Sequence, residues 1–241
     1  MSAEALALPA IEAPPPSDVP QGPGRVWATK GIAFWAVLSA LLVKAKPESL
    51  LEIGAGRSTT FLADYAFRFR KRFVSIEQDA AWHAKVAEDL RCMNLKGSYV
   101  HHVPLDTRET PPWYDREKLV AATGDKPFDL VFVDGPQGAG RRNAEGRKAV
   151  RRACRAARLI IVDDVHRPYN LTMFRELAQK RFPTGGVVYH RYANNVIGLA
   201  AAEEWKGLLT GCFDFLDQPW TPDMPDLPRP VGKQEAREDD A

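Results

Sequence analysis

A glycine turn between a strand and a helix constrains this chain more than any other feature. The stretch Ser49–Thr60 reads SLLEIGAGRSTT. Its apolar start predicts a strand that ends in an acid, Glu52, and the glycines at Gly54–Gly56 then break the chain before it restarts as a helix. Such a turn brings bare backbone N–H groups and the positive end of a helix dipole up to a bound nucleotide-like ligand.

Strands and helices alternate along the rest of the chain. The predicted strands are Leu50–Ile53, Arg72–Glu77, Ser98–Val103, Phe128–Asp134, Leu159–Val162, Val187–Tyr192 and Val196–Ala201. The predicted helices are Gly31–Lys44, Ser58–Phe69, Ala80–Met93, a short one within Thr107–Lys126, Asn143–Ala156 and Pro168–Phe182. This order predicts an α/β fold: a doubly wound, mostly parallel seven-stranded sheet that closes with a C-terminal antiparallel hairpin.

The composition predicts one globular domain between two tails. The chain has 241 residues, of which 45% are apolar and 27% charged, which is usual for a single globular domain. Residues 1–25 are rich in Pro and Ala, and residues 217–241 are rich in Pro with an acidic end, so we expect tails there and a folded domain at 26–216. Widely spaced cysteines and the lack of a signal-peptide pattern favour a cytoplasmic protein without a membrane partner.

The chain resembles the class I S-adenosylmethionine-dependent methyltransferases over residues 31–201. In that family an acid precedes two glycines, as Glu52 precedes Gly54 and Gly56 here. A second acid ends the second strand of the family, and Glu77 stands at that position. The resemblance implies a methyltransferase domain with S-adenosylmethionine as cofactor, in which Glu77 accepts both ribose hydroxyls.

The same resemblance implies further cofactor contacts. Ser58 replaces the third family glycine, and we expect its hydroxyl to cap the helix instead. Asp106 follows the third strand, where the family often has an acid that reads the adenine amino group. SIEQDAAW is similar to a family signature, so Trp82 is either the tryptophan that packs near adenine or a core residue. The predicted cofactor-binding residues are Glu52, Gly54, Ala55, Gly56, Ser58, Glu77 and Asp106.

Two more strands end in carboxylates, at Asp134 and at the pair Asp163 and Asp164. Because parallel strands end along one edge of a sheet, we expect these acids beside the glycine turn. Converging carboxylates repel one another, and a hard divalent cation relieves that repulsion. The arrangement resembles the metal-dependent O-methyltransferases, which implies Mg²⁺ or a similar metal on these three acids, where it would lower the pKa of an acceptor hydroxyl. The alternative is helix capping, or contact with the methionine amino group, without a metal.

Around these acids the chain is similar to the glucuronoxylan 4-O-methyltransferase family. VDGP, and the Asp-Val-x-Arg pattern within IIVDDVHRPYN, match that family, which implies a sugar hydroxyl as acceptor. His166 is the predicted general base, with Asp134 as the second catalytic residue; a surface-loop histidine is the alternative. Arg141 and Arg142 open the arginine-rich helix and are predicted to bind an acidic acceptor such as a uronate or phosphate.

The predicted function is S-adenosylmethionine-dependent O-methylation of a small-molecule or saccharide hydroxyl, with help from a divalent metal. The basic run Arg141–Arg158 leaves an RNA methyltransferase, or a non-catalytic RNA-binding module, as an alternative. Its low aromatic content argues against nucleic acid as the partner. An NAD-dependent oxidoreductase is a further alternative, disfavoured because Thr59 replaces the last dinucleotide glycine and a hairpin closes the sheet.

Overall fold

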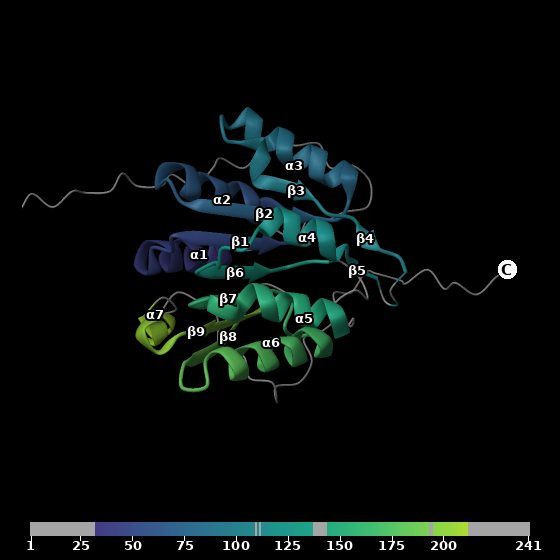
Figure 1. Ribbon diagram of the computed structural model, residues 1–241. Coiled ribbons are helices and arrows are strands. Elements are labelled where there is room, and N and C mark those ends of the chain that lie inside the picture. The colour runs from purple at the N-terminus through teal and green to yellow at the C-terminus, as the bar shows by residue number, and fades with distance from the viewer. Residues whose placement is uncertain (1–31, 109, 111, 137–143, 193–194, 212–241) are drawn as a thin grey trace, which may run out of the picture.

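The computed structural model describes residues 32–108, 110, 112–136, 144–192 and 195–211, which form a seven-stranded sheet covered by helices on both faces (Figure 1). The strands of this sheet are β1 (Ser49–Ile53), β2 (Arg72–Glu77), β3 (Val100–His102), β6 (Leu130–Val133), β7 (Leu159–Val162), β8 (Gly186–Tyr192) and β9 (Asn195–Ala201). The helices are α1 (Ile32–Ala45), α2 (Arg57–Arg68), α3 (Ala80–Cys92), α4 (Arg116–Thr123), α5 (Ala144–Ala153), α6 (Pro168–Arg181) and α7 (Lys206–Gly211). Both predicted tails, 1–25 and 217–241, lie outside the described residues.

The strand order is β3-β2-β1-β6-β7-β9-β8. The first five of these strands run parallel, while β9 is antiparallel to both β7 and β8. The predicted doubly wound sheet with a terminal hairpin is therefore confirmed. The chain leaves β1 towards β2 on one side and later returns to β6 on the other, so the crossover direction reverses between β1 and β6. In open α/β sheets, ligands bind at the carboxyl ends of the strands at such a switch point.

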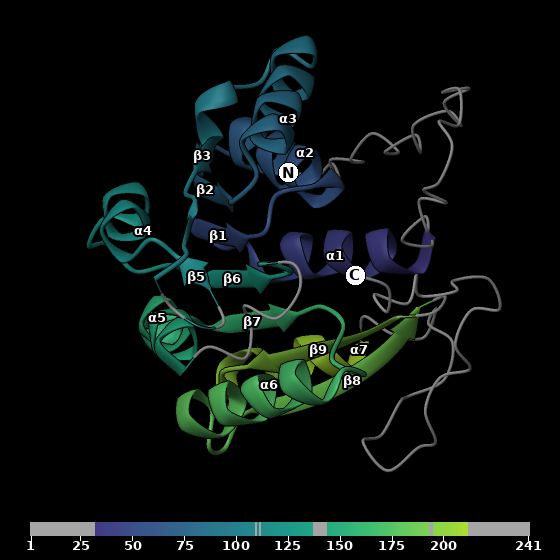
Figure 2. The same cartoon turned by 90° about the vertical axis from the view of Figure 1, so that its right-hand side faces the viewer.

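Each face of the sheet carries its own hydrophobic core. Helices α1, α2, α3 and α7 cover one face, and α4, α5 and α6 cover the other (Figure 2). Successive side chains of a strand point to opposite faces, so Leu50 packs in the first core and Leu51 in the second. Because Glu52 shares a face with Leu50, its carboxylate lies under α2.

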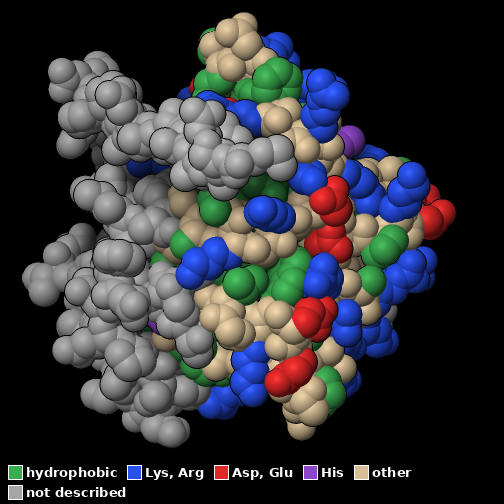
Figure 3. Space-filling model, turned by 90° about the vertical axis from the view of Figure 1, so that its left-hand side faces the viewer, with side chains coloured by type: hydrophobic (Ala, Val, Ile, Leu, Met, Phe, Trp, Pro, Cys, Tyr) green, Lys and Arg blue, Asp and Glu red, His purple; other side chains and the backbone are tan. Residues whose placement is uncertain are grey.

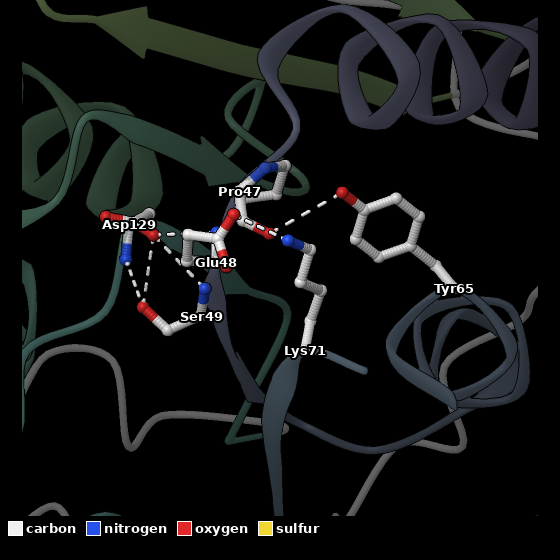
Figure 4. A network of polar contacts seen from close by, with 6 residues as sticks. All are labelled: Pro47, Glu48, Ser49, Tyr65, Lys71 and Asp129. Carbon is white, nitrogen blue, oxygen red and sulfur yellow. Dashed lines mark hydrogen bonds and ion pairs between the residues drawn. The ribbon is translucent and has the colours of Figure 1, made fainter. Parts of the chain in front are cut away.

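Polar contacts tie together the amino ends of the central strands (Figure 4). Asp129 Oδ2 accepts the backbone N–H groups of Glu48 at 2.8 Å and Ser49 at 3.1 Å. The Lys71 Nζ lies 2.5 Å from Glu48 Oε1. Burial, helped by the charge of Glu48, raises the pKa of Tyr65 to about 12. These contacts join the starts of β1, β2 and β6, so the carboxyl ends of those strands emerge level with one another.

The structure departs from the predicted elements in several places. A 3₁₀ turn, η1 (Gly97–Tyr99), delays the third strand, and a small separate sheet of β4 (Leu105–Asp106) and β5 (Trp113–Tyr114) precedes α4. Two further 3₁₀ turns, η3 (Cys154–Ala156) and η4 (Glu203–Trp205), follow α5 and β9. Within the described ranges no helix is long and apolar enough to cross a membrane.

Candidate functional site

The glycine turn after β1 packs backbone to backbone against the turn after β6. Gly54 has φ +99°, a conformation that side chains rarely adopt, and a Cβ on it would lie 2.5 Å from Gly135 N. The Gly54 amide donates to Ile76 O at 2.9 Å, and the Gly135 amide donates to Ile53 O at 2.7 Å. Glycine at position 54 is therefore required by the fold itself, both for its dihedral angle and for the close approach of the second turn.

Gly56 has no such requirement from the protein. Its φ of −171° is extended, and no atom of the described residues lies within 4 Å of the position that a Cβ would take. The space in front of Gly56 is open, next to the first N–H groups of α2. A ligand that lay against the backbone there would account for glycine at this position, because any side chain would occupy the same space.

Both polar groups of Ala55, between the two glycines, are held by β2 and α3. Its N–H donates to Glu77 Oε2 at 3.2 Å, and its carbonyl accepts the Trp82 indole N–H at 2.9 Å. The Trp82 backbone amide is itself capped by Asp79 Oδ1 at 2.7 Å. Trp82 is half-buried, so it supports the turn from α3, a role that sequence reasoning did not assign to it.

Glu77 accepts three backbone N–H groups. Its Oε1 accepts the backbone N–H groups of Gln78 and Asp79, both at 2.7 Å, in addition to the Ala55 contact at Oε2. Burial raises the pKa of Glu77, and these three hydrogen bonds partly oppose that rise. A carboxylate offers roughly four lone-pair positions, so Oε2 has room for one ligand hydroxyl. A second hydroxyl would have to displace the Ala55 N–H.

Glu52 is fully buried beneath the glycine turn. Its Oε2 accepts the hydroxyls of Thr59 and Ser75, both at 2.6 Å, and Thr59 Oγ1 in turn accepts the Gly56 amide at 2.8 Å. Glu52 thus positions the turn and the start of α2 from below, while its predicted contact with a cofactor stays a prediction. The expectation that Ser58 caps α2 is wrong: Thr59, three residues after the N-cap Gly56, accepts the Gly56 amide, which is one half of a capping box.

Asp106 lies on β4 and is bound to Arg108. Its Oδ1 accepts Arg108 Nε at 2.8 Å, and its Oδ2 accepts Nη2 at 2.7 Å. The guanidinium holds the pKa of Asp106 at about 2. Its predicted contact with adenine stays a prediction, and an adenine amino group would compete with Arg108 for this carboxylate.

The acids after β6 and β7 do reach the same edge as the glycine turn. Val133 and Val162 are paired in the sheet, and Asp134 and Asp163 follow them directly. The backbone of Asp134, like that of Gly135, packs against Gly54: a Cβ on Gly54 would lie 2.8 Å from the carbonyl carbon of Asp134. The predicted convergence of these strand ends is confirmed.

The predicted metal site is not supported, because Asp163 and Asp164, which follow β7, contact neighbouring residues of their own loop. Asp163 Oδ1 accepts the Asp164 amide at 2.8 Å, and Asp164 Oδ2 lies 3.0 Å from Arg167 Nη2. Asn170 donates to both backbone carbonyls, at 3.3 and 3.0 Å. Across the described part of the chain no three His, Cys, Asp or Glu residues gather closely enough to hold a metal ion. Asp134, Asp163 and Asp164 therefore do not fit the ligand set that the sequence suggested.

His166 is half-buried in the loop between β7 and α6, two residues after Asp164. The structure thus puts it at the same edge of the sheet as Asp134 and the glycine turn, and its role as a base stays a prediction. Arg141 and Arg142 lie outside the described residues, so their role at an acceptor is equally a prediction.

The fold and this edge define the class: the chain has the Rossmann-like fold of the class I methyltransferases. It is similar to the solved structure of cofactor-bound Rv0187 from MTB, with 20% identity, a TM-score of 0.51 and coverage of 75% of this chain and 83% of that one. The precorrin-6y C5,15-methyltransferase of Geobacter metallireducens GS-15 gives 15% identity, a TM-score of 0.45 and coverage of 70% and 86%. No protein-family model and no curated protein matches the sequence.

Proposed function

We propose that this chain is an S-adenosylmethionine-dependent methyltransferase that methylates a hydroxyl of a small-molecule or saccharide acceptor. The observation that carries the proposal is the space in front of Gly56, where a Cβ would meet no atom of the described part of the chain within 4 Å. The fold alone does not require glycine there, whereas a ligand against the first N–H groups of α2 does. The fold of class I methyltransferases makes S-adenosylmethionine the best candidate for that ligand.

In this proposal the chain's own residues bind and orient the cofactor. Glu77 accepts a ribose hydroxyl, and the positive end of α2 lies beside the methionine carboxylate. Trp82 and Glu52 hold the turn rigid through their contacts with Ala55 and Thr59. When bound, the cofactor supplies an electrophilic methyl group, so catalysis consists mainly in aligning the acceptor oxygen with it.

The proton of the acceptor needs a base at the same edge. His166 is our candidate, because a neutral imidazole near pH 7 can take a hydroxyl proton. Asp134, whose backbone abuts Gly54, is the candidate that orients the acceptor. The proposed reaction includes no metal, because the acids after β6 and β7 do not form a ligand set among the described residues.

Two measurements test the proposal. S-adenosylhomocysteine should raise the melting temperature in a saturable way, since a ligand that binds only the native state stabilises it; NAD serves as the negative control. Transfer of a labelled methyl group into fractionated extract should then place the label in carbohydrate or small molecules. A protein that is stabilised by NAD and not by S-adenosylhomocysteine would contradict the proposal, and label in RNA would change the acceptor.

A further inference from the structure

A cavity of about 380 Å³ lies between α4 and α5, on the second face of the sheet. Its buried wall is mostly apolar and includes Leu51 of β1, Leu119 of α4 and Val150 of α5. Phe128, just before β6, closes one end, with the Arg72 guanidinium 4.0 Å from the centre of its ring. Cavities of this size and lining bind small molecules with a substantial apolar part.

The mouth of this cavity is strongly basic. Five exposed cationic residues line it, against the single acid Asp125: Arg116, Lys126, Lys148, Arg152 and Arg155. Among the described residues Arg116, Lys126 and Arg152 form no ion pair. Figure 3 shows Lys and Arg side chains gathered along its right-hand side, which is the side of α4 and α5. An anionic group at the mouth would face complementary charge.

Trp113 supplies an independent sign of a missing partner. It is 3% exposed and lines the cavity, yet its indole N–H has no hydrogen-bond partner in the described part of the chain. Buried indole N–H groups usually find an acceptor. An oxygen of an anionic head group would provide one, and Arg116, three residues further on, lines the same cavity.

The cavity is separate from the glycine turn. Ala55, Gly56 and Glu77 are not among its lining residues. Tyr114 lines it and stands between it and that turn, because a Cβ on Gly135 would come within 2.6 Å of the Tyr114 hydroxyl. Ile53, the last residue of β1, also lines the cavity, so a ligand there would lie along the sheet face beside α4 and end next to the glycine turn, with Tyr114 between the two.

We propose that the cavity between α4 and α5 binds an anionic amphiphile. Its apolar body would lie against Leu51, Leu119 and Val150, and its carboxylate or phosphate head at the basic mouth. This inference does not rest on the proposed methyl transfer.

Titration of the full-length protein with dodecanoate and with dodecyl phosphate, followed by calorimetry, tests the proposal. Dodecanol and dodecyltrimethylammonium are the uncharged and cationic controls. We expect saturable one-site binding of either or both anions, and the preferred one identifies the head group. The double variant R116E/R152E should weaken that binding by at least about tenfold, because it places two acids at the mouth.

Matched variants separate binding in the cavity from binding elsewhere. Ala153→Phe fills the cavity from α5 and should remove binding, while Lys118→Glu makes, outside the cavity on α4, the charge change of one of the two substitutions in R116E/R152E and should leave binding unaltered. The proposal is overturned by anion binding that survives both R116E/R152E and A153F, by equal binding of the cationic amphiphile, or by no binding at all. S-adenosylhomocysteine titration of the same variants reports on the glycine turn independently, so either proposal can fail alone.

Discussion

Two glycines that look equivalent in the sequence differ in what requires them. Gly54 has a positive φ and touches the backbone of Gly135, so the folded chain needs it even without a ligand. Gly56 is extended and faces open space. Substitution of Gly54 should therefore lower the stability of the fold, whereas substitution of Gly56 should weaken ligand binding.

The pair Gly54→Ala and Gly56→Ala tests this separation. We expect G54A to lower the free energy of unfolding by at least about 2 kcal/mol, because the strained φ and the backbone clash both oppose the new methyl group. G56A should change stability by no more than about 1 kcal/mol and should lower the affinity for S-adenosylhomocysteine by at least about tenfold. Urea unfolding and ligand titration measure the two effects. Unaltered affinity in G56A would remove the ligand from this turn.

Glu77 should contribute to both stability and binding. Glu77→Gln replaces one acceptor oxygen by an NH₂ group that faces backbone N–H donors, so we expect a loss of about 1–3 kcal/mol in the free energy of unfolding. Binding of S-adenosylhomocysteine should fall as well, since the ribose loses its acceptor. Glu88→Gln, on the exposed side of α3, is the control and should leave the affinity unaltered. Full affinity in E77Q would contradict the ribose role.

His190 makes stability depend on pH. Burial lowers the pKa of this histidine from 6.5 to about 4. The unfolded chain therefore binds the proton more readily, and the contribution of His190 to stability, complete above pH 6.5, is lost as the pH falls towards 4. Each unit of pKa difference corresponds to about 1.4 kcal/mol, so the loss should be a few kcal/mol.

The difference in the free energy of unfolding between the wild type and His190→Leu isolates the pH-dependent contribution of His190. The free energy of unfolding, measured in urea at several pH values from 7 to 4, should fall less steeply in the variant. His102→Gln, at an exposed position on β3, should follow the wild-type curve. Parallel curves for H190L and wild type would show that His190 carries no such shift.

At the scale of elements, the start of α2 depends on two hydroxyls that converge on one buried acid. Thr59 closes the first turn by accepting the Gly56 amide and donating to Glu52, and Ser75 donates to the same oxygen from β2. A helix start that is held in this way presents its N–H groups in one orientation before any ligand arrives, which lowers the entropic cost of binding.

Thr59→Val keeps the shape of the side chain and removes the hydroxyl. Loss of an N-terminal capping bond and of a hydroxyl to a buried carboxylate should cost about 1–3 kcal/mol of stability. We also expect weaker binding of S-adenosylhomocysteine, because the turn above Glu52 loosens. Thr59→Ser restores the hydroxyl and should recover most of both losses. A T59V protein with wild-type stability would mean that the Glu52 contact contributes nothing net.

Hydrophobic periodicity and turn residues in the sequence predict most helices and strands, because the signals for these elements are local. The strand at Leu50–Ile53, the hairpin and the short helix before Lys126 follow from apolar runs and turn residues alone. The small sheet of β4 and β5 could not be predicted, since each strand has only two residues and depends on pairing with the other. The cap by Thr59 has no clear sequence signal, because the N-cap is a glycine and its partner is a threonine instead of a glutamate or glutamine.

At the scale of the whole molecule, topology brought the strand-end acids to one edge as predicted, but it could not predict where their side chains turn. Asp164 has φ +56° and pairs with Arg167, and both features depend on contacts that are made only in the folded chain. The arginine-rich helix raises the same issue. Its charges suggested a nucleic-acid surface, whereas the structure gives Arg151, and Arg158 shortly after the helix, partners within the fold.

Arg151 and Arg158 tie α5 and the start of β7 to the elements around them. Arg151 lies 3.0 Å from Glu176 of α6, and Arg158 lies 3.2 Å from Glu204 while its guanidinium stacks 4.1 Å from the centre of the Trp205 ring. These contacts are half-exposed, so each ion pair contributes at most about 1 kcal/mol, and the stacked ring adds about 0.5–1 kcal/mol. Charges engaged in this way are less available to phosphates.

The double variant R151A/R158A therefore distinguishes a structural role from an RNA-binding role. We expect the free energy of unfolding to fall by about 1–2 kcal/mol, and we expect no salt-dependent gel shift with single- or double-stranded RNA in either protein. Arg91→Ala, an exposed arginine paired within α3, is the control and should change stability by no more than about 0.5 kcal/mol. A wild-type complex with RNA that weakens with salt and is lost in R151A/R158A would make nucleic acid the partner. The two arginines would then contribute to the affinity by contacting phosphates and releasing counterions.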